Sequence, residues 1–486
     1  MNTQINAPIE NTLATAPVQD DPIPLMQRRR LVIYLITSVI GFIILVLPAR
    51  SGVSVPIFVV LQGILLWRMF PRRKHLLLLL PIFVFALNSF ISANPMWRSA
   101  NLMVSAVLFG LMQVWALYGI SFQDKTHSIL YRVAYAICGA FSKVKIPFKW
   151  GVGINIENRK MARRVLIGIS LSIPALIFLV IMLSAADAIF SNIMDDIFWR
   201  IIYSIYIGTI PRIIFGTAAG LYMFGVVYGM VASRTVEKAH NGLRPIVGDC
   251  VILNIVLGST LAVYTLFVAI QFRYLFASPD SLPYGLTFVT YARRGFFELL
   301  FLTGANIAFI LATVGMTKNQ KGRGAKITKR LCLYLCGVTV VLLVSSFYRM
   351  WLYGSDDGLT RMRLLVFGFL FFEGIGLVFT FMYILRPKFN IVLVYALIAL
   401  SYFLVLNLVP IDRIIAREQV NRYFAGQRTC VAYVLSLSPD AAPEIERLLS
   451  SPNDSTQTAA RRVLFTMRGE SRNDSWRQWN LARGRV

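Results

Sequence analysis

The sequence has few of the residues on which soluble and catalytic proteins rely. Only 15% of its 486 residues are charged, whereas soluble globular proteins carry about 25%. Acidic residues number 23, against 49 lysines and arginines. Three histidines and five cysteines are too few and too scattered for a haem, a zinc site or a disulfide framework. This balance excludes an ordinary soluble domain and points to a polytopic membrane protein.

Local motifs of known chemistry are also missing. Residues 321–326 (KGRGAK) lack the spacing and the preceding strand of a phosphate-binding loop. The chain has neither a HExxH zinc motif nor a GxSxG nucleophile elbow. We therefore expect no metal and no cofactor, and the sequence argues against an enzyme. A lipid-modifying enzyme is the third of three functional hypotheses, because no nucleophile or metal constellation supports it.

Long apolar runs are what the chain has in abundance. A helix of about 20 apolar residues crosses the roughly 30 Å hydrocarbon core of a bilayer, where the backbone finds no other hydrogen-bond partner. We predict an all-α fold, a polytopic transmembrane helical bundle of about eleven spans with a small helical extracytoplasmic C-terminal tail. The predicted spans are residues 31–48, 53–70, 76–93, 100–120, 165–186, 207–232, 246–275, 296–316, 331–351, 364–385 and 389–409.

The loops between these runs alternate between basic and nearly uncharged. Loops on one side, with the N-terminal arginines, hold 27 of the lysines and arginines, and loops on the other side hold seven. Because basic loops stay in the cytoplasm, the asymmetry orients the spans. We expect a multi-pass protein of the bacterial inner membrane with a cytoplasmic N-terminus. The basic loops should contact anionic lipids, and their position argues against a nucleic-acid partner.

Three regions follow from this pattern. Residues 1–30 are expected to be a disordered cytoplasmic arm, too polar for a cleaved signal peptide. Residues 31–410 form the transmembrane helical domain, and residues 411–486 form a tail of short helices that carries twelve arginines and no lysine. With eleven spans the tail is extracytoplasmic. A re-entrant segment within residues 185–206 would place it inside.

Ionisable and small residues inside the spans are the first candidates for function or packing. Charged groups are costly in the membrane, so Glu373, Asp249 and Arg212 are candidates by default. Glu373 could couple protons or be a carboxyl hydrogen-bonded within the bundle. Asp249 could reach the inner interface, and Arg212 could extend to the outer one. In the span 207–232, the two motifs Gly216-xxx-Gly220 and Gly225-xxx-Gly229 favour close helix packing, with a hinge or a dimer face as the alternative.

Polar and aromatic residues gather at the predicted outer ends of the later spans. Arginine forks beside carboxylates suit either an anionic ligand or mutual ion pairs within an aromatic belt. We predict an outer vestibule of Arg273, Arg293, Arg349 and Arg363 that leads towards Glu373.

Six stretches of the chain carry a family resemblance. They are residues 183–190 (LSAADAIF), 267–276 (FVAIQFRYLF), 291–300 (YARRGFFELL), 348–353 (YRMWLY) with 358–360 (GLT), 410–416 (PIDRIIA) with Asn421 and Arg422, and 433–443 (YVLSLSPDAAP). In this order they resemble the bacterial membrane proteins of domain of unknown function four-one-seven-three and its relative four-one-five-three, over roughly residues 184–449. The resemblance implies a helical inner-membrane protein with an outward-facing helical tail and no known activity. It carries over Tyr291, Arg293, Gly295, Phe296, Arg349, Tyr353, Gly358 and Thr360 as recurring residues of unknown role.

Two functional hypotheses stay open. In the first, the protein is permease-like and handles a small anionic solute at the outer vestibule, with Glu373 as a proton-coupling carboxyl. The absence of a detectable inverted repeat argues against it. In the second, it is a non-transporting envelope sensor or accessory protein whose outer loops and tail, residues 411–486, bind a protein partner.

Overall fold

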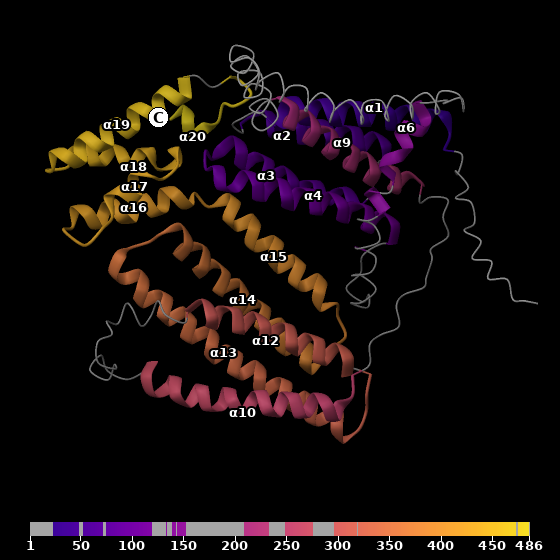
Figure 1. Ribbon diagram of the computed structural model, residues 1–486, viewed down its shortest axis with the longest axis vertical. Coiled ribbons are helices and arrows are strands. Elements are labelled where there is room, and N and C mark those ends of the chain that lie inside the picture. Colours follow the sequence, from indigo (N-terminus) through magenta and orange to yellow (C-terminus); the bar gives the residue numbers. More distant parts are fainter. Residues whose placement is uncertain are drawn as a thin grey trace, which may run out of the picture.

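A computed structural model describes residues 23–47, 52–70, 74–118, 133, 139–141, 143–151, 209–232, 248–275, 296–317, 319–472 and 475–485. The regular elements in these residues are all helices, which form two half-bundles and a tail (Figure 1). The predicted all-α helical bundle is therefore confirmed. The N-terminal half contains α1 (Leu25–Gly41), η1 (Phe42–Val46), α2 (Ser54–Met69), η2 (Lys74–Leu78), α3 (Leu79–Ile91), α4 (Pro95–Tyr118), η3 (Lys143–Lys145), α6 (Ile146–Gly151) and α9 (Thr209–Ala232).

The C-terminal half is built from five long helices. They are α10 (Cys250–Leu275), α12 (Phe296–Thr317), α13 (Arg323–Asp357), α14 (Arg361–Leu385) and α15 (Ile391–Leu408). Leu335, Leu342 and Ile310 are fully buried at the centre of this half. Helix α15 joins the halves, because its first turns pack in this core while Phe403 packs against Phe85 of α3.

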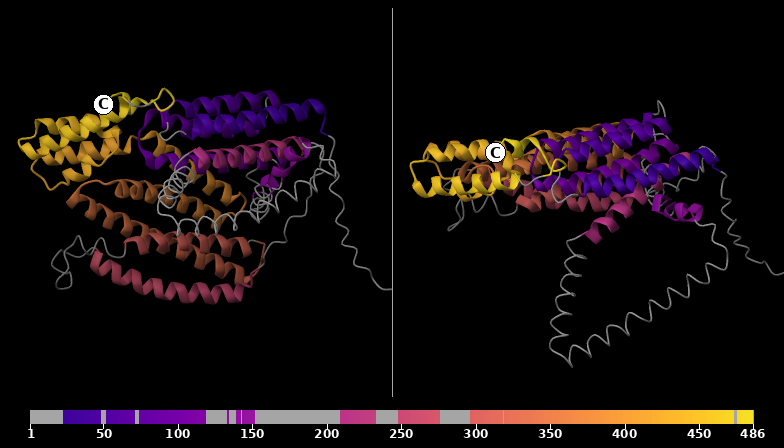
Figure 2. Two further views of the ribbon diagram at one scale, coloured as in Figure 1. Left: turned by 45° about the horizontal axis from the view of Figure 1, so that its top comes forward. Right: turned by 90° about the horizontal axis from the view of Figure 1, so that it is seen from above.

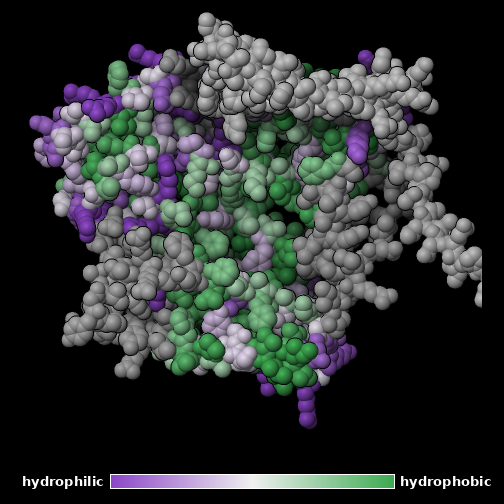
Figure 3. Space-filling model, in the orientation of Figure 1, coloured by the Kyte–Doolittle hydropathy of each residue, from purple (hydrophilic) through white to green (hydrophobic). Residues whose placement is uncertain are grey.

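The tail has a core of its own at one end of the bundle. It comprises α16 (Ile411–Phe424), α17 (Val431–Leu435), η5 (Pro439–Ala441), α18 (Ala442–Arg447), η6 (Leu448–Ser450), α19 (Asp454–Arg472) and α20 (Leu481–Gly484). Ile415, Ile445 and Ala460 are fully buried in it. The tail extends beyond the ends of the long helices and lies across both halves (Figures 1 and 2). Its surface is largely hydrophilic, whereas the helices of the C-terminal half expose hydrophobic side chains (Figure 3).

Nine described helices are long and apolar enough to cross a membrane, and α2 is a shorter apolar helix. These ten elements coincide with ten of the eleven predicted spans, and the fifth span, 165–186, lies outside the described residues. The first helix already begins at Leu25, so the three N-terminal arginines lie within it. The chain is thus a multi-pass integral membrane protein. We call the end of the bundle that carries the tail the tail side, and the opposite end the basic side.

The glycines of α9 show how closely the helices of the N-terminal half approach. A Cβ atom added to Gly220 would collide with Val39 of α1, 2.9 Å from its Cα atom, and one added to Gly216 would collide with Ile43. Since this contact involves the backbone of α1, no rotamer change can relieve it. The glycine motif therefore serves packing between α9 and α1, the first of its two interpretations.

This close approach predicts that Gly220→Ala destabilises the protein by about 1–3 kcal/mol through overpacking. The measurement is the unfolding midpoint of the purified protein in detergent. Gly258→Ala on α10 is the matched control, because its Cβ would meet no atom within 4 Å. An equal response of the two variants would contradict the packing role.

Candidate functional site

The tail is attached to both halves of the bundle. On the N-terminal half, the Val53 amide donates to the Trp479 carbonyl (3.0 Å) and the Asn480 amide group donates to the Ser92 carbonyl (3.4 Å). On the C-terminal half, the Leu359 backbone amide donates to a carboxylate oxygen of Glu418 on α16 (3.0 Å). The turn before α14, the turn before α4 and the tail therefore meet at one junction.

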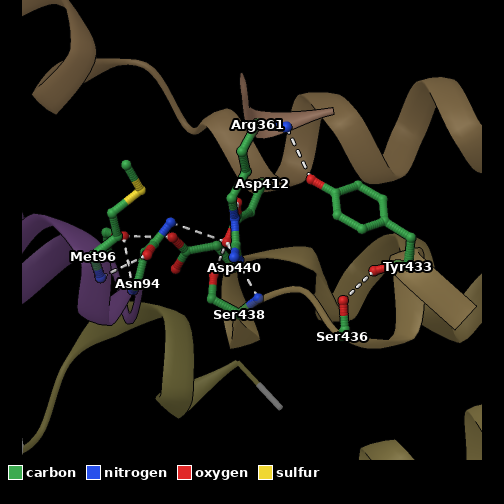
Figure 4. Close-up of polar contacts among 9 residues, drawn as sticks. Asn94, Met96, Arg361, Asp412, Tyr433, Ser436, Ser438 and Asp440 are labelled. Atoms are coloured by element: carbon green, nitrogen blue, oxygen red, sulfur yellow. Dashed lines mark hydrogen bonds and ion pairs between the residues drawn. The ribbon is translucent and has the colours of Figure 1, made fainter. Parts of the chain in front are cut away.

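Asp412 of α16 is the centre of this junction (Figure 4). Its side chain is fully buried and accepts two hydrogen bonds of 2.6 Å from Arg361, in a bidentate ion pair. The Asn94 side-chain amide (3.1 Å), the Ser438 hydroxyl (2.5 Å) and the Ser438 backbone amide (3.2 Å) also donate to it. A buried carboxylate is tolerated only with such partners, so these contacts determine where the tail sits.

Local structure orients Asn94 and shapes the turn next to Arg361. Asn94 accepts from the Met96 amide at the start of α4 (3.0 Å), so its NH₂ group faces Asp412. Thr360 caps α14 by accepting from the Arg363 amide. Gly358 has φ +80°, and a Cβ there would collide with Gln419 of α16. The positive φ therefore requires glycine at this turn, and a side chain there would also displace the end of Gln419.

A second carboxyl, Asp440 of η5, lies beside the first. It accepts from the Ser92 hydroxyl and from the Ala93 amide (2.8 Å), which ties the tail to the end of α3. Burial raises the pKa of Asp440; the two hydrogen bonds oppose this shift and the negative charge of Asp412 adds to it. The folded junction therefore holds a proton on Asp440 more tightly than the unfolded chain does.

A cleft of about 560 Å³ opens at the junction. Its walls come from all three parts of the protein, namely the turn before α4, the first residue of α14 and the tail. Its cationic residues are Arg361, Arg462 and Arg483, with Glu470 as the acidic one. The remaining walls are formed by Ala93, Pro95, Ser436, Leu437, Ser438, Pro439, Val463, Thr466 and Met467.

Further cations lie next to this cleft. Arg98 of α4 is within electrostatic range of Arg483 and of Arg212, which lies exposed in the first turn of α9. Arg212, selected from the sequence as an ionisable residue of a span, is thus at the tail side. The junction collects arginines from α4, α9, α14 and the tail, as an anion-binding surface would.

The backbone places the other predicted vestibule residues at the same side. Arg273 is in the last turn of α10, Phe296 begins α12 and Tyr353 is near the end of α13. Tyr291, Arg293 and Gly295 lie outside the described residues.

Two arginines of the predicted vestibule are buried rather than open to solvent. Arg349 and Arg363 are each 5% exposed, and Arg363 donates to the Gly358 carbonyl. In the structure the cleft is lined by other arginines, namely Arg361, Arg462 and Arg483. The Asp412 junction was missed because its members are far apart in sequence, although three of the six stretches of the family resemblance, 358–360, 410–416 and 433–443, meet there.

Glu373 lies deeper in the bundle and is 8% exposed. Met350, Val366 and Leu370 form an apolar cluster into which Leu300, Leu343 and Phe367 also pack. On α14 the order is Arg363, Val366, Leu370 and Glu373, so two members of this cluster lie between Glu373 and Arg363.

Asp249, the remaining candidate, precedes the first residue of α10 at the basic side. It is exposed and accepts from the Val251 amide (2.7 Å), as a residue at the start of a helix does. Among the described residues, no group of three histidine, cysteine or acidic side chains gathers as metal ligands would.

The Asp412 ion pair predicts a large effect of Asp412→Asn. Asp412 is fully buried but its partner Arg361 is 29% exposed, so the cost should be that of hydrogen bonds lost between charged groups, about 1.5–3 kcal/mol. We expect the tail to detach, which limited proteolysis of residues 411–486 would detect. In the control Glu446→Gln, which removes the exposed pair with Arg468 (3.4 Å), the cost should be about 0–1 kcal/mol. Equal proteolysis of the two variants would refute the role of Asp412.

The raised pKa of Asp440 predicts a pH dependence of the junction. Because the folded pKa lies above the ordinary value of 3.8, the contribution to stability is complete below that value and is lost as pH rises through the folded pKa. Unfolding midpoints of wild type and Asp440→Asn should therefore diverge between acidic and neutral pH, with wild type losing stability relative to the variant. Parallel pH profiles would contradict the shift.

A comparison with known families finds a match to one of the two families that the sequence resembles. The family described as Domain of unknown function (DUF4153) matches residues 79–448. The match begins in α3, so it includes the third and fourth spans, in which the sequence showed no recognisable motif. No curated protein and no solved structure matches the chain. Because the family match covers more than half of the 486 residues, the chain belongs to the DUF4153 family.

Proposed function

We propose that this integral membrane protein captures a small anionic solute in the cleft between its tail and its membrane helices, without carrying the solute across the bilayer. The observation that supports this proposal best is the set of three arginines in a cleft of about 560 Å³. Small-molecule sites have volumes of about 300–1,000 Å³ and combine apolar walls with a few convergent polar groups. In the proposed orientation the tail is extracytoplasmic and the basic side faces the cytoplasm of a bacterium.

The three arginines of the cleft would have different roles. Arg361 is engaged by Asp412, so its role is to hold the cleft in shape. Arg462 is exposed, and its only side-chain-mediated hydrogen bond among the described residues is the one that its carbonyl accepts from the Thr466 hydroxyl, which leaves its guanidinium for a carboxylate or phosphate. Arg483 is partly held by the Gln478 carbonyl (3.3 Å) and borders the same space.

Capture without transport is favoured by the apolar cluster around Leu370. A solute that moved from the cleft to Glu373 would pass Arg363, whose guanidinium is buried against the Gly358 carbonyl, and then a layer of packed hydrophobic side chains. An anion entering that layer would lose its hydration without gaining a partner.

A second candidate function is supported by the shape of the tail. The tail is a folded helical unit that extends beyond the membrane helices, and it exposes Phe465 (78%) among arginines of α19. Such a surface suits an acidic protein partner. A photo-crosslinking residue at position 465 tests this candidate in intact cells. A defined adduct from position 465, with no such adduct when the crosslinker is placed at position 458 of the same helix instead, would favour this second candidate function.

The first candidate predicts that Arg462→Ala weakens anion binding. A hydrogen bond to a charged group is worth about 1.5–3 kcal/mol, so we expect a loss of about ten-fold or more. The probes are inorganic phosphate, succinate and citrate, and the measurement is the anion-dependent shift of the unfolding midpoint of the full-length protein. Arg461→Ala is the matched control, because Arg461 is equally exposed but lies outside the cleft.

Three outcomes would contradict the proposal. The first is that none of the three anions shifts the midpoint of the wild-type protein, and the second is that both arginine variants respond alike. The third is that the anion that binds is also taken up by proteoliposomes, in which case the permease hypothesis is correct.

A further inference from the structure

Helix α12 carries a polar face inside the C-terminal half-bundle. Thr303, Asn306, Thr313 and Thr317 follow one another at intervals of three, seven and four residues, which places them on one face of the helix. All four are buried. This face runs from the middle of the bundle to the basic side, where α12 ends at Thr317. An interior helix of this kind is expected to bury apolar or small side chains there.

The protein itself does not satisfy all of these groups. Asn306 accepts from the Tyr264 hydroxyl (2.8 Å), but its NH₂ group has no acceptor. The Thr313 hydroxyl also lacks a partner. Each unpaired buried polar group costs about 1–3 kcal/mol. Water molecules in the interior are the usual partners of such groups.

Glu373 stands at the inner end of this face, in the middle of the bundle. Its carboxyl lies beside the Thr303 hydroxyl, and neither carboxyl oxygen meets a hydrogen-bond donor in a geometry that would pair it. The Thr303 hydroxyl already donates to the Leu300 carbonyl (2.8 Å), so it presents only lone pairs to the carboxyl. A protonated Glu373 can donate to those lone pairs, whereas an ionised one cannot.

Among the described residues, the helices around Glu373 contribute a tyrosine, a thiol and, on α13, the buried Arg349. Helix α15 contributes Tyr395, which is within electrostatic range and shares a hydrogen bond with Thr380 of α14 (2.7 Å). Helix α13 contributes the thiol of Cys336, which lies within range of Tyr395. Towards the tail side, Glu373 is preceded on α14 by Leu370 and its apolar cluster, whereas the polar face of α12 leads from Glu373 towards the basic side.

We propose that Glu373 is a proton-binding site that exchanges its proton with the basic side, along a hydrated path over the polar face of α12. The neutral acid donates to Thr303. On release, its O–H bond breaks and a water molecule beside Asn306 accepts the proton. Ile310 lies on the same face between Asn306 and Thr313, which are about 10 Å apart along the helix. Water must pass beside that side chain. This site is independent of the cleft at the tail side.

Cysteine accessibility tests the hydrated path. Full-length protein whose five cysteines are replaced by alanine is reconstituted in nanodiscs and treated with a charged methanethiosulfonate reagent, which reacts with thiolates in water. We expect Asn306→Cys and Thr313→Cys to react about ten-fold or more faster than Ile307→Cys, since a thiolate forms only where water reaches it. Ile307 is the matched control, because it lies at the same depth and is buried in the apolar core of this half.

Carbodiimide labelling of the otherwise unaltered protein tests the proton on Glu373. Dicyclohexylcarbodiimide adds to a protonated carboxyl in an apolar setting, and the adduct is located by mass spectrometry of peptides. We expect an adduct on Glu373 that is missing in Glu373→Gln, while the exposed Glu446 stays unmodified. Equal reactivity of the three cysteine variants, or an unmodified Glu373, would each overturn the proposal.

Discussion

The tail side of this protein depends on one buried carboxylate. Asp412 has no contact with solvent, and its donors come from the turn before α4, from the start of α14 and from the tail. A charge in such a place needs all of its partners at once, so the three segments can occupy only one mutual arrangement. The position of the tail, the walls of the cleft and the burial of Asp440 follow from that arrangement.

The tail side and the interior of the C-terminal half carry two different kinds of chemistry. At the tail side, three arginines from α14, α19 and α20 line an open cleft, and Arg98 of α4 lies within electrostatic range of one of them. In the middle of the C-terminal half, Glu373 faces hydroxyl groups and the polar face of α12. On α14, Val366 and Leu370 of the apolar cluster lie between Arg363 and Glu373. Because the cleft and Glu373 share no residue and lie at different depths along α14, we treat the cleft and the proton site as separate functions.

The predicted outer vestibule shows that a residue pattern can predict the end of the bundle at which a residue lies, but not the direction of its side chain. Loop charge and span order placed Arg349 and Arg363 at one end of the bundle, and the structure has them there. Which way each side chain points depends on helix rotation. Arg361 and Arg363 are two residues apart and therefore about 200° apart around α14. The first reaches Asp412, and the second is buried against Gly358. Only the packing of α14 on its neighbours decides which of the two faces the cleft.

Composition and hydrophobic patterning were enough to predict the class of protein, the ten helices that coincide with predicted spans, and the helical tail. These features depend on local composition, because a lipid interior accepts only helices whose backbone bonds are internal. The junction, in contrast, follows from helix packing, which brings Arg361 into an ion pair with Asp412 and adds Asn94 and Ser438 as further donors to the same carboxylate. Such a site depends on distance in space. More than 300 residues of chain separate Asn94 from Asp412, and no local pattern records their contact.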